Sequence, residues 1–142
     1  MKQRAGTDLY LAAASFSRAL TRIAEEEFAP SALSPSYAFL LLAIEEQAGS
    51  QPSLLAQEMD LAASTVTRLL DKLETRGLIR RKTTGKASQV FLTPAARKLL
   101  PGVHKCKAAL AKRVQSLLGR NAAELTEQMV QGRMALWPDP ES

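Results

Sequence analysis

The side chains best suited to chemistry in this chain lie on one predicted helix, residues 63–76. Apolar residues recur there at i, i+3, i+4 and i+7 and form a single stripe, as on a helix that faces a protein core. The opposite side is polar, rich in hydroxyl groups, and basic. Such side chains can reach base edges and phosphates when a helix lies in the major groove of duplex DNA. The stripe consists of Val66, Leu69, Leu70 and Leu73, and the polar side carries Ser64, Thr65, Thr67, Arg68 and Lys72.

The segments around this helix complete a known arrangement. A short helix over residues 52–60, for which Ser53 is the predicted cap, precedes it after a tight turn. Gly77 ends the longer helix, and two short strands over residues 78–83 and 89–92 follow, joined by a loop that contains Gly85. Residues 52–93 therefore predict a winged helix-turn-helix, a DNA-binding unit. The basic residues of its predicted wing are Arg80, Arg81, Lys82 and Lys86.

Long helices flank this unit. The predicted ranges are 7–28, about 34–47 with Pro35 at the first helical position, 94–118 with Thr93 as its cap, and 122–137, followed by a loose tail over 138–142. Pro101 should kink the third of these helices. The predicted fold is thus mainly α with a small β-wing, in one domain over residues 1–142.

The flanking helices carry more apolar side chains than one small chain can bury. This surplus predicts a homodimer in which the helices at 7–28 and 94–137 form the interface. The apolar residues concerned are Leu9, Phe16, Leu20, Leu110, Val114, Leu117, Leu125, Met129, Met134 and Leu136.

Composition supports a globular protein with a polyanionic partner. Of the 142 residues 46% are hydrophobic and 23% charged, and the formal net charge is +5. Lys and Arg are concentrated between residues 68 and 86 and between 97 and 120, whereas acidic residues gather at 25–27 and 45–46. A basic surface of this kind is typical of proteins that bind nucleic acid.

Several other classes of protein are disfavoured. A single cysteine, Cys106, and a single histidine, His104, cannot form an internal disulfide or a conventional zinc site. No phosphate-binding glycine loop, nucleophile elbow or paired-histidine motif occurs, so we expect neither an enzyme nor a cofactor. Because no signal segment occurs and no apolar run approaches the ~20 residues that span a bilayer, we expect a cytoplasmic protein without membrane contact.

The sequence from Ser53 to Leu99 resembles the MarR family, the multiple antibiotic resistance regulators. The likeness is carried by STVTRLLDKLETRGLIRR, Ser64 to Arg81, and by LTPAARKLL, Leu92 to Leu100. The resemblance implies a dimeric transcription factor, usually a repressor, that binds a palindromic operator and is often released by a small aromatic or otherwise lipophilic ligand. By position it implies base contacts from Ser64, Thr65, Thr67 and Arg68, phosphate contacts from Ser53 and Lys72, and a wing in the minor groove. Together with the basic clusters, it predicts further phosphate contacts from Arg80 and Lys82.

Two features depart from the family pattern. The wing of the family usually carries Asp-x-Arg, and the matching positions here are Thr84 and Lys86. Lysine keeps the charge but lacks the planar guanidinium, which predicts weaker and less selective wing contacts. The second departure is Ala62-Ala63, where a capping residue commonly begins the recognition helix. An uncapped start costs about 1 kcal/mol.

Two alternative functions remain open at this stage. The altered wing is compatible with a winged helix that binds protein and no longer reads DNA. Cys106 is compatible with a thiol-based redox sensor, although an inert buried thiol is the commoner state of a free cysteine.

Asp71 is unfavourable near phosphates, and it could instead orient Arg68 or a neighbouring cation.

Overall fold

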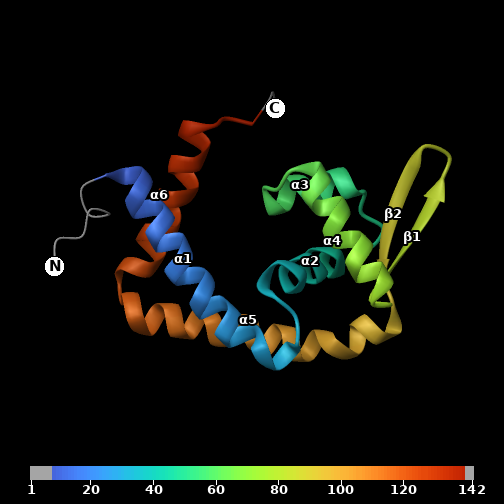
Figure 1. The fold of residues 1–142 in the computed structure, drawn as a ribbon, viewed down its shortest axis with the longest axis horizontal. Helices are drawn as coiled ribbons and strands as arrows, with labels where there is room; N and C mark the ends of the chain where they lie inside the picture. The colour runs from blue at the N-terminus through green and yellow to red at the C-terminus, as the bar shows by residue number, and fades with distance from the viewer. Residues whose placement is uncertain (1–7, 140–142) are drawn as a thin grey trace. The chain divides into compact units, whose positions relative to one another are not determined.

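The computed structural model describes residues 8–139. It is mainly helical with one two-stranded antiparallel sheet, which confirms the predicted fold class (Figure 1). The chain divides into two compact units, Met1–Lys107 and Ala108–Ser142. The described elements are α1 (Leu9–Phe28), η2 (Ala29–Ser31), α2 (Pro35–Glu46), α3 (Pro52–Met59), α4 (Ala63–Thr75), β1 (Ile79–Thr84), β2 (Ala87–Leu92), α5 (Pro94–Leu118) and α6 (Asn121–Leu136).

Side-chain caps mark the starts of α1 and α5. The Asp8 side chain accepts a hydrogen bond of 2.9 Å from the backbone N–H of Tyr10 and starts α1. Thr7, the predicted first residue of this helix, lies outside the described residues. Thr93 caps α5 as predicted, because its hydroxyl oxygen accepts a 3.2 Å hydrogen bond from the N–H of Ala96. Of the predicted tail, residues 140–142 also lie outside the described part.

The helix-turn-helix consists of α3, a three-residue turn and α4. The turn begins at Asp60, whose backbone is left-handed with φ +52°. The prediction that Ser53 caps α3 is wrong, because Gln51 occupies the N-cap and Ser53 is the second helical residue. Proline favours the first helical position, so the residue before Pro52 becomes the cap.

Helix α4 ends as the sequence predicts. Gly77 has φ +74°, and the N–H of Leu78 donates a 2.9 Å hydrogen bond back to the carbonyl of Leu73. This pattern closes the last turn and directs the chain into β1. Gly77 suits the position because a residue with a Cβ is strained at this φ.

The core of the first unit is built around α2 and α4. Val66, Leu70 and Leu73 of α4 are completely buried, which confirms the predicted stripe, while Leu69 is half-buried. Burial of each of these side chains contributes roughly 2 kcal/mol. Phe28 at the end of α1 packs on Phe39 of α2 with ring centroids 5.4 Å apart. The other fully buried large side chains are Leu40, Leu41, Ile44, Leu55, Ile79, Val90 and Val103.

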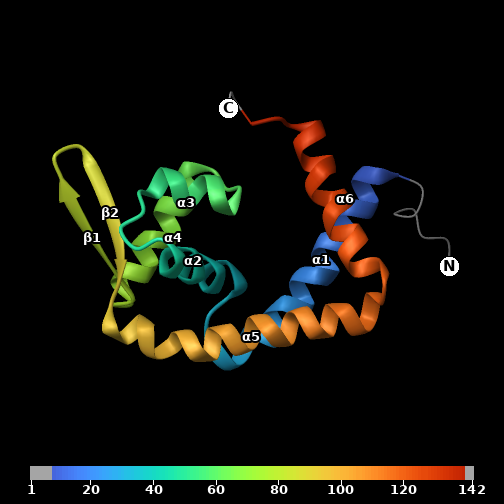
Figure 2. The ribbon, with the colours of Figure 1, turned by 180° about the vertical axis from the view of Figure 1, so that it is seen from behind.

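The β-hairpin projects away from helices α2, α3 and α4 in both ribbon views (Figures 1 and 2). Its strands pair from Ile79–Leu92 to Thr84–Ala87, so only Gly85 and Lys86 form the turn. Gly85 has φ +63°, as tight hairpin turns require. Strand β1 is shifted by one residue from its predicted range, and β2 begins two residues earlier than predicted.

Helix α5 runs through Pro101 without interruption from Pro94 to Leu118. The kink expected there stays a prediction. Within residues 8–139 no single helix is long and apolar enough to cross a membrane. One bent pair, Leu9–Ser31 with Pro35–Glu46 at 66°, reaches that length and composition together, and the second of these helices lies in the protein core.

Candidate nucleic-acid interface

The polar side of α4 is accessible over the length of the helix. Ser64, Thr67, Arg68 and Lys72 are exposed, and Thr65 is half-buried. Because the apolar stripe holds the opposite side in the core, the helix presents this face at a fixed rotation. A helix that presents such a face could enter a groove about 12 Å wide.

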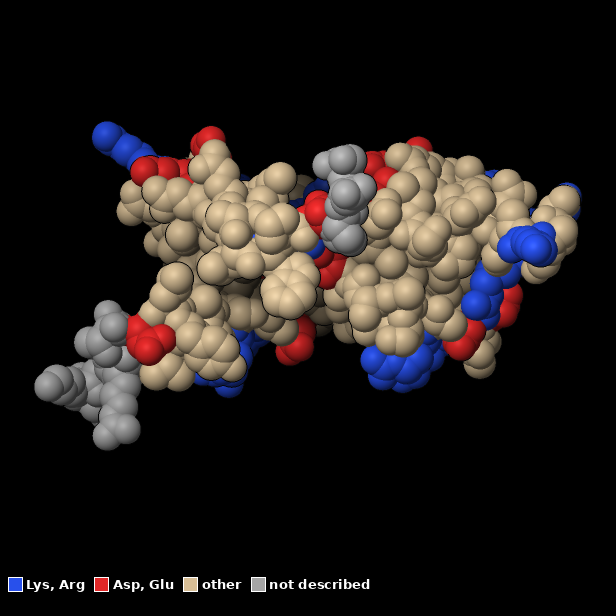
Figure 3. Space-filling view, turned by 90° about the horizontal axis from the view of Figure 1, so that it is seen from above, with Lys and Arg blue, Asp and Glu red and all other residues tan. Residues whose placement is uncertain are grey.

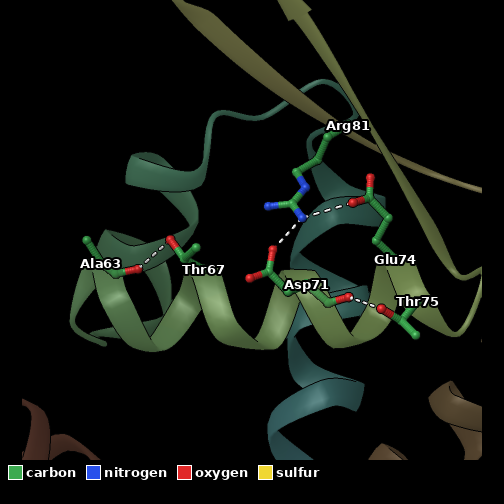
Figure 4. Close-up of polar contacts among 6 residues, drawn as sticks. All are labelled: Ala63, Thr67, Asp71, Glu74, Thr75 and Arg81. Carbon is green, nitrogen blue, oxygen red and sulfur yellow. Dashed lines mark hydrogen bonds and ion pairs between the residues drawn. The ribbon is translucent and has the colours of Figure 1, made fainter.

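Two hydroxyl groups on α4 already use their protons. The Thr67 hydroxyl donates a 3.0 Å hydrogen bond to the carbonyl of Ala63, and Thr75 donates one of 2.9 Å to the carbonyl of Asp71 (Figure 4). In this state Thr67 presents its methyl group and its oxygen lone pairs to a partner. It can therefore contact a thymine methyl or accept a hydrogen bond from a base amino group.

The start of α4 lacks a side-chain cap, as the sequence predicts. Ala62 occupies the N-cap with extended backbone and makes no side-chain hydrogen bond. Its carbonyl accepts from the N–H groups of Thr65 and Val66 at 3.0 and 3.1 Å.

The wing places its cations on two faces and at its tip. Successive side chains of a strand point to opposite sides, so Arg80 and Lys82 lie on the face opposite to Arg81. Lys86 is exposed in the two-residue turn. Ser53 is exposed on α3. The predicted site residues thus come from α3, α4 and the hairpin, all within the first unit.

Within the described part of the chain, most site cations make no ion pair. This holds for Arg68, Lys72, Arg80, Lys82 and Lys86. On the face drawn in Figure 3, Lys and Arg side chains near the wing, at the right, have Asp and Glu side chains between them. The basic groups are therefore available to an anionic partner, but they do not form one unbroken patch on this face.

Arg81 is the exception, and its sequence position alone predicted no separate role for it. From β1 it reaches two carboxylates of α4: its Nη2 atom lies 2.5 Å from Asp71 Oδ1 and 2.9 Å from Glu74 Oε1 (Figure 4). The Arg81 side chain is only 23% exposed. Asp71 therefore orients a neighbouring cation, one of the two options expected for it, and that cation is Arg81.

The charges of this cluster stabilise one another. The hydrogen bond from Arg81 lowers the pKa of Glu74 below its ordinary value, and the attraction of the Arg81 charge acts in the same direction. Hydrogen bonds to Glu74 and Asp71 raise the pKa of Arg81. The signal in the sequence is the Asp and Glu pair at i and i+3 on α4. Nothing local connects that pair to a strand residue seven positions beyond Glu74.

A shallow groove of about 360 Å³ lies elsewhere in the first unit, between α2, α5 and the end of β2. At one edge His104 Nε2 lies 2.6 Å from Glu45 Oε1. The thiol of Cys106 is buried on α5. No cluster of three metal-ligating side chains occurs among residues 8–139. The groove is lined by Ile44, Glu45, Ala48, Leu92, Arg97, Leu100, Pro101 and His104.

Comparison with known proteins identifies the winged-helix region. A sequence model of the MarR family matches residues 33–88, from just before α2 into β2. Over this segment the chain is similar to the MarR family. The resemblance expected from Ser64 to Arg81 is thereby confirmed. A search of curated proteins found no match.

Solved structures of MarR-family regulators share the fold over nearly the whole chain. CouR from Rhodococcus jostii RHA1 bound to p-coumaroyl-CoA is 20% identical, with a TM-score of 0.76 over 99% of this chain and 100% of that chain. The repressor CouR bound to a 23-mer DNA duplex is 22% identical, with a TM-score of 0.78 over 93% and 98%. The transcriptional regulator SlyA is 20% identical, with a TM-score of 0.76 over 92% and 94%.

Proposed function

We propose that this protein is a MarR-like transcriptional regulator over residues 1–142, which acts as a repressor by occupying operator DNA. The observation that carries the proposal is the exposed polar face of α4, held over a buried stripe and flanked by a hairpin with free cations. CouR, a neighbour in fold, is described as a repressor bound to duplex DNA.

Each site residue then has a role. We assign base contacts to Ser64, Thr65, Thr67 and Arg68, since their side chains lie on α4 where a major groove would be read. Contacts to phosphates hold the register of the protein on the duplex. We assign these to Ser53, Lys72, Arg80 and Lys82, and a minor-groove contact to Lys86.

We further propose that the protein works as a homodimer on a palindromic operator. Every apolar residue that the sequence analysis assigned to the dimer interface is at least partly exposed in the single chain. Leu9 at the start of α1 and Leu136 at the end of α6 are 77% and 76% exposed. Covering these helices with a second copy would remove such side chains from water. Two recognition helices would then lie about 34 Å apart, one helical turn of DNA.

The groove between α2, α5 and β2 is a candidate site for an effector. Its walls are largely apolar, and Leu92 at the end of β2 forms part of it. A ligand that binds one position of the hairpin more tightly than another would shift DNA affinity by that difference. The p-coumaroyl-CoA complex of CouR supports a small-molecule effector for proteins of this fold.

Footprinting on the DNA upstream of the protein's own gene, followed by anisotropy titrations with the protected duplex, tests the proposal. We expect one protected palindrome and an affinity that falls steeply with salt. The three cations per protomer assigned to phosphates, six per dimer, would give a log–log slope of about −5. A protein that protects no site and shows no salt-dependent binding would instead be a winged-helix module for protein partners.

A further inference from the structure

Both strands of the hairpin are fixed to the rest of the first unit at a cross-strand row that lies beyond the buried pair Ile79–Leu92 at its base. Arg81 of β1 pairs with Val90 of β2 in the register. Val90 is completely buried, and its backbone bridges to the segment before α3: its N–H donates to the Ser50 carbonyl at 2.9 Å, and its carbonyl accepts from the Gly49 N–H at 3.0 Å. Strand β2 is therefore fixed at this row by the main chain.

Strand β1 is fixed at the same row by a side chain. The Nη2 atom of Arg81 binds Asp71 and Glu74, one helical turn apart on α4 (Figure 4). Beyond the row, Lys82, Thr83 and Thr84 of β1 are exposed, and Lys82 forms no ion pair within the described chain. The direction in which the wing leaves the unit is thus set at Arg81 and Val90.

We propose that Arg81 is a positioning residue, whose two-carboxylate clamp on α4 fixes the wing relative to the recognition helix and so determines the sequence preference beside each half-site. This inference rests on the proposed function for its DNA consequence. The clamp itself does not depend on DNA. Arg81 is not assigned any contact with the duplex.

Arg81 also neutralises the negative charges of Asp71 and Glu74, and this effect is separate from holding the wing in place. Without Arg81, the carboxylates of Asp71 and Glu74 would repel nearby phosphates and weaken binding to every sequence. A test must therefore remove the clamp with and without leaving these charges behind. Arg81→Gln leaves both carboxylates. Arg81→Gln combined with Asp71→Asn and Glu74→Gln removes the clamp and the charges together.

The first measurement uses no DNA. In a Cys106→Ser background, spin labels at Thr84→Cys on the wing and Gln57→Cys on α3 report the distance between wing and helix-turn-helix by double electron–electron resonance. We expect a narrow distribution with Arg81 and a clearly broader one in both Arg81→Gln variants. Arg80→Gln is the matched control, since it removes a free cation from the other face of the same strand, and it should leave the distribution narrow.

The second measurement compares operators with A·T-rich and G·C-rich flanks. We expect the triple variant to regain most of the overall affinity lost in Arg81→Gln while its preference between flanks stays reduced about fivefold or more. Arg80→Gln should lower affinity for both flanks alike. An unchanged distance distribution in Arg81→Gln overturns the inference, and so does a triple variant with the full flank preference. If the unaltered protein binds no DNA, the proposed function fails, and the distance measurement still decides whether Arg81 positions the wing.

Discussion

The hydroxyl of Thr93 donates a 2.6 Å hydrogen bond to the carbonyl of Gly77 and so joins the residue that ends α4 to the start of α5. The same oxygen caps α5 through the N–H of Ala96. Thr93 is buried, so loss of its hydroxyl would leave both backbone groups without this partner. One side chain thus connects the end of α4 to the helix that leads into the second unit.

Thr93→Ala should therefore lower the free energy of unfolding by about 2 kcal/mol, because it removes the cap of α5 and the hydrogen bond to the Gly77 carbonyl. Thr93→Ser keeps the hydroxyl and should lose less than half as much. Urea unfolding followed by circular dichroism measures both variants. Equal losses in the two would show that packing of the methyl group, and not the hydroxyl, is what matters.

Arg68→Ala should weaken operator binding and leave the fold intact. Arg68 lies on the exposed side of α4, and a lost base contact is worth about 1 to 3 kcal/mol. Lys98→Ala removes an exposed cation from α5 that is not among the proposed DNA contacts, and it serves as the control. Gel-shift titrations and thermal melts of both variants are the measurements. An Arg68→Ala protein with the control's affinity would exclude α4 as the helix that reads DNA.

The wing can be tested at its tip. Lys86→Arg together with Thr84→Asp restores the family-like pair and should tighten binding where the flanking minor groove is narrow and A·T-rich, because guanidinium is more weakly hydrated than ammonium. Lys86→Ala should weaken binding to all sequences and reduce the salt slope by about one contact per wing. Measuring the affinity for operator DNA as a function of salt concentration distinguishes the two variants from the unaltered protein. Identical curves for all three proteins would mean that the turn at Gly85 does not touch DNA.

Deletion of residues 1–28 should abolish the stable dimer. The deletion removes α1, whose apolar residues Leu9, Phe16 and Leu20 are all at least partly exposed in the single chain. It also removes Phe28, whose ring is completely buried against α2. We expect aggregated or unfolded protein by light scattering. The milder variant Leu9→Glu, at an exposed position, should shift the full-length protein towards monomer without unfolding it, and an unchanged dimer would contradict a role for the start of α1.

The Arg81 clamp should also give a small pH dependence. The pKa of Glu74 is lowered in the folded protein, chiefly by the hydrogen bond from Arg81. Its stabilising effect is therefore present above the unfolded-state value, near 4.5, and is lost as the pH falls through the lower folded value. Because Glu74 is 44% exposed, solvent screening limits the effect to about 0.5 kcal/mol.

Unfolding free energies between pH 7 and pH 3 test this expectation. Glu74→Gln should lose less stability on acidification than the unaltered protein. Glu58→Gln on α3, an exposed carboxylate outside the clamp, should follow the unaltered protein. The same acid dependence in all three proteins would mean that the clamp contributes nothing measurable to stability.

Periodicity and capping rules predicted the elements that carry the site. The stripe from Val66 to Leu73 determined the rotation of α4, and Gly77 and Thr93 marked boundaries that the structure confirms. The cap of α3 was predicted wrongly because the capping preference of the Ser53 hydroxyl was placed above the preference of Pro52 for the first helical position. Sequence patterns within one helix or strand were thus sufficient to predict features that depend only on neighbouring residues.

The Arg81 cluster could not be predicted in the same way. Its partners lie on another element, and their meeting depends on how β1 turns back along α4 after Gly77. Strand length near Ala87 was missed for a similar reason. Ala87 and Ser88 pair with β1 but have no strong strand preference of their own, so the partner strand determines their conformation.

The hairpin beyond the Arg81–Val90 row has a consequence for the kinetics of this protein. Its last three cross-strand pairs form a two-stranded ribbon, and such ribbons alone are only marginally stable in water. The backbone amide of Thr83 should then exchange with deuterium much faster than that of Leu70 in the core, because the ribbon opens without global unfolding. Ordering this ribbon against a duplex would cost conformational entropy. A change that stiffens the free ribbon would therefore lengthen the lifetime of a complex with DNA without altering any side chain that touches it.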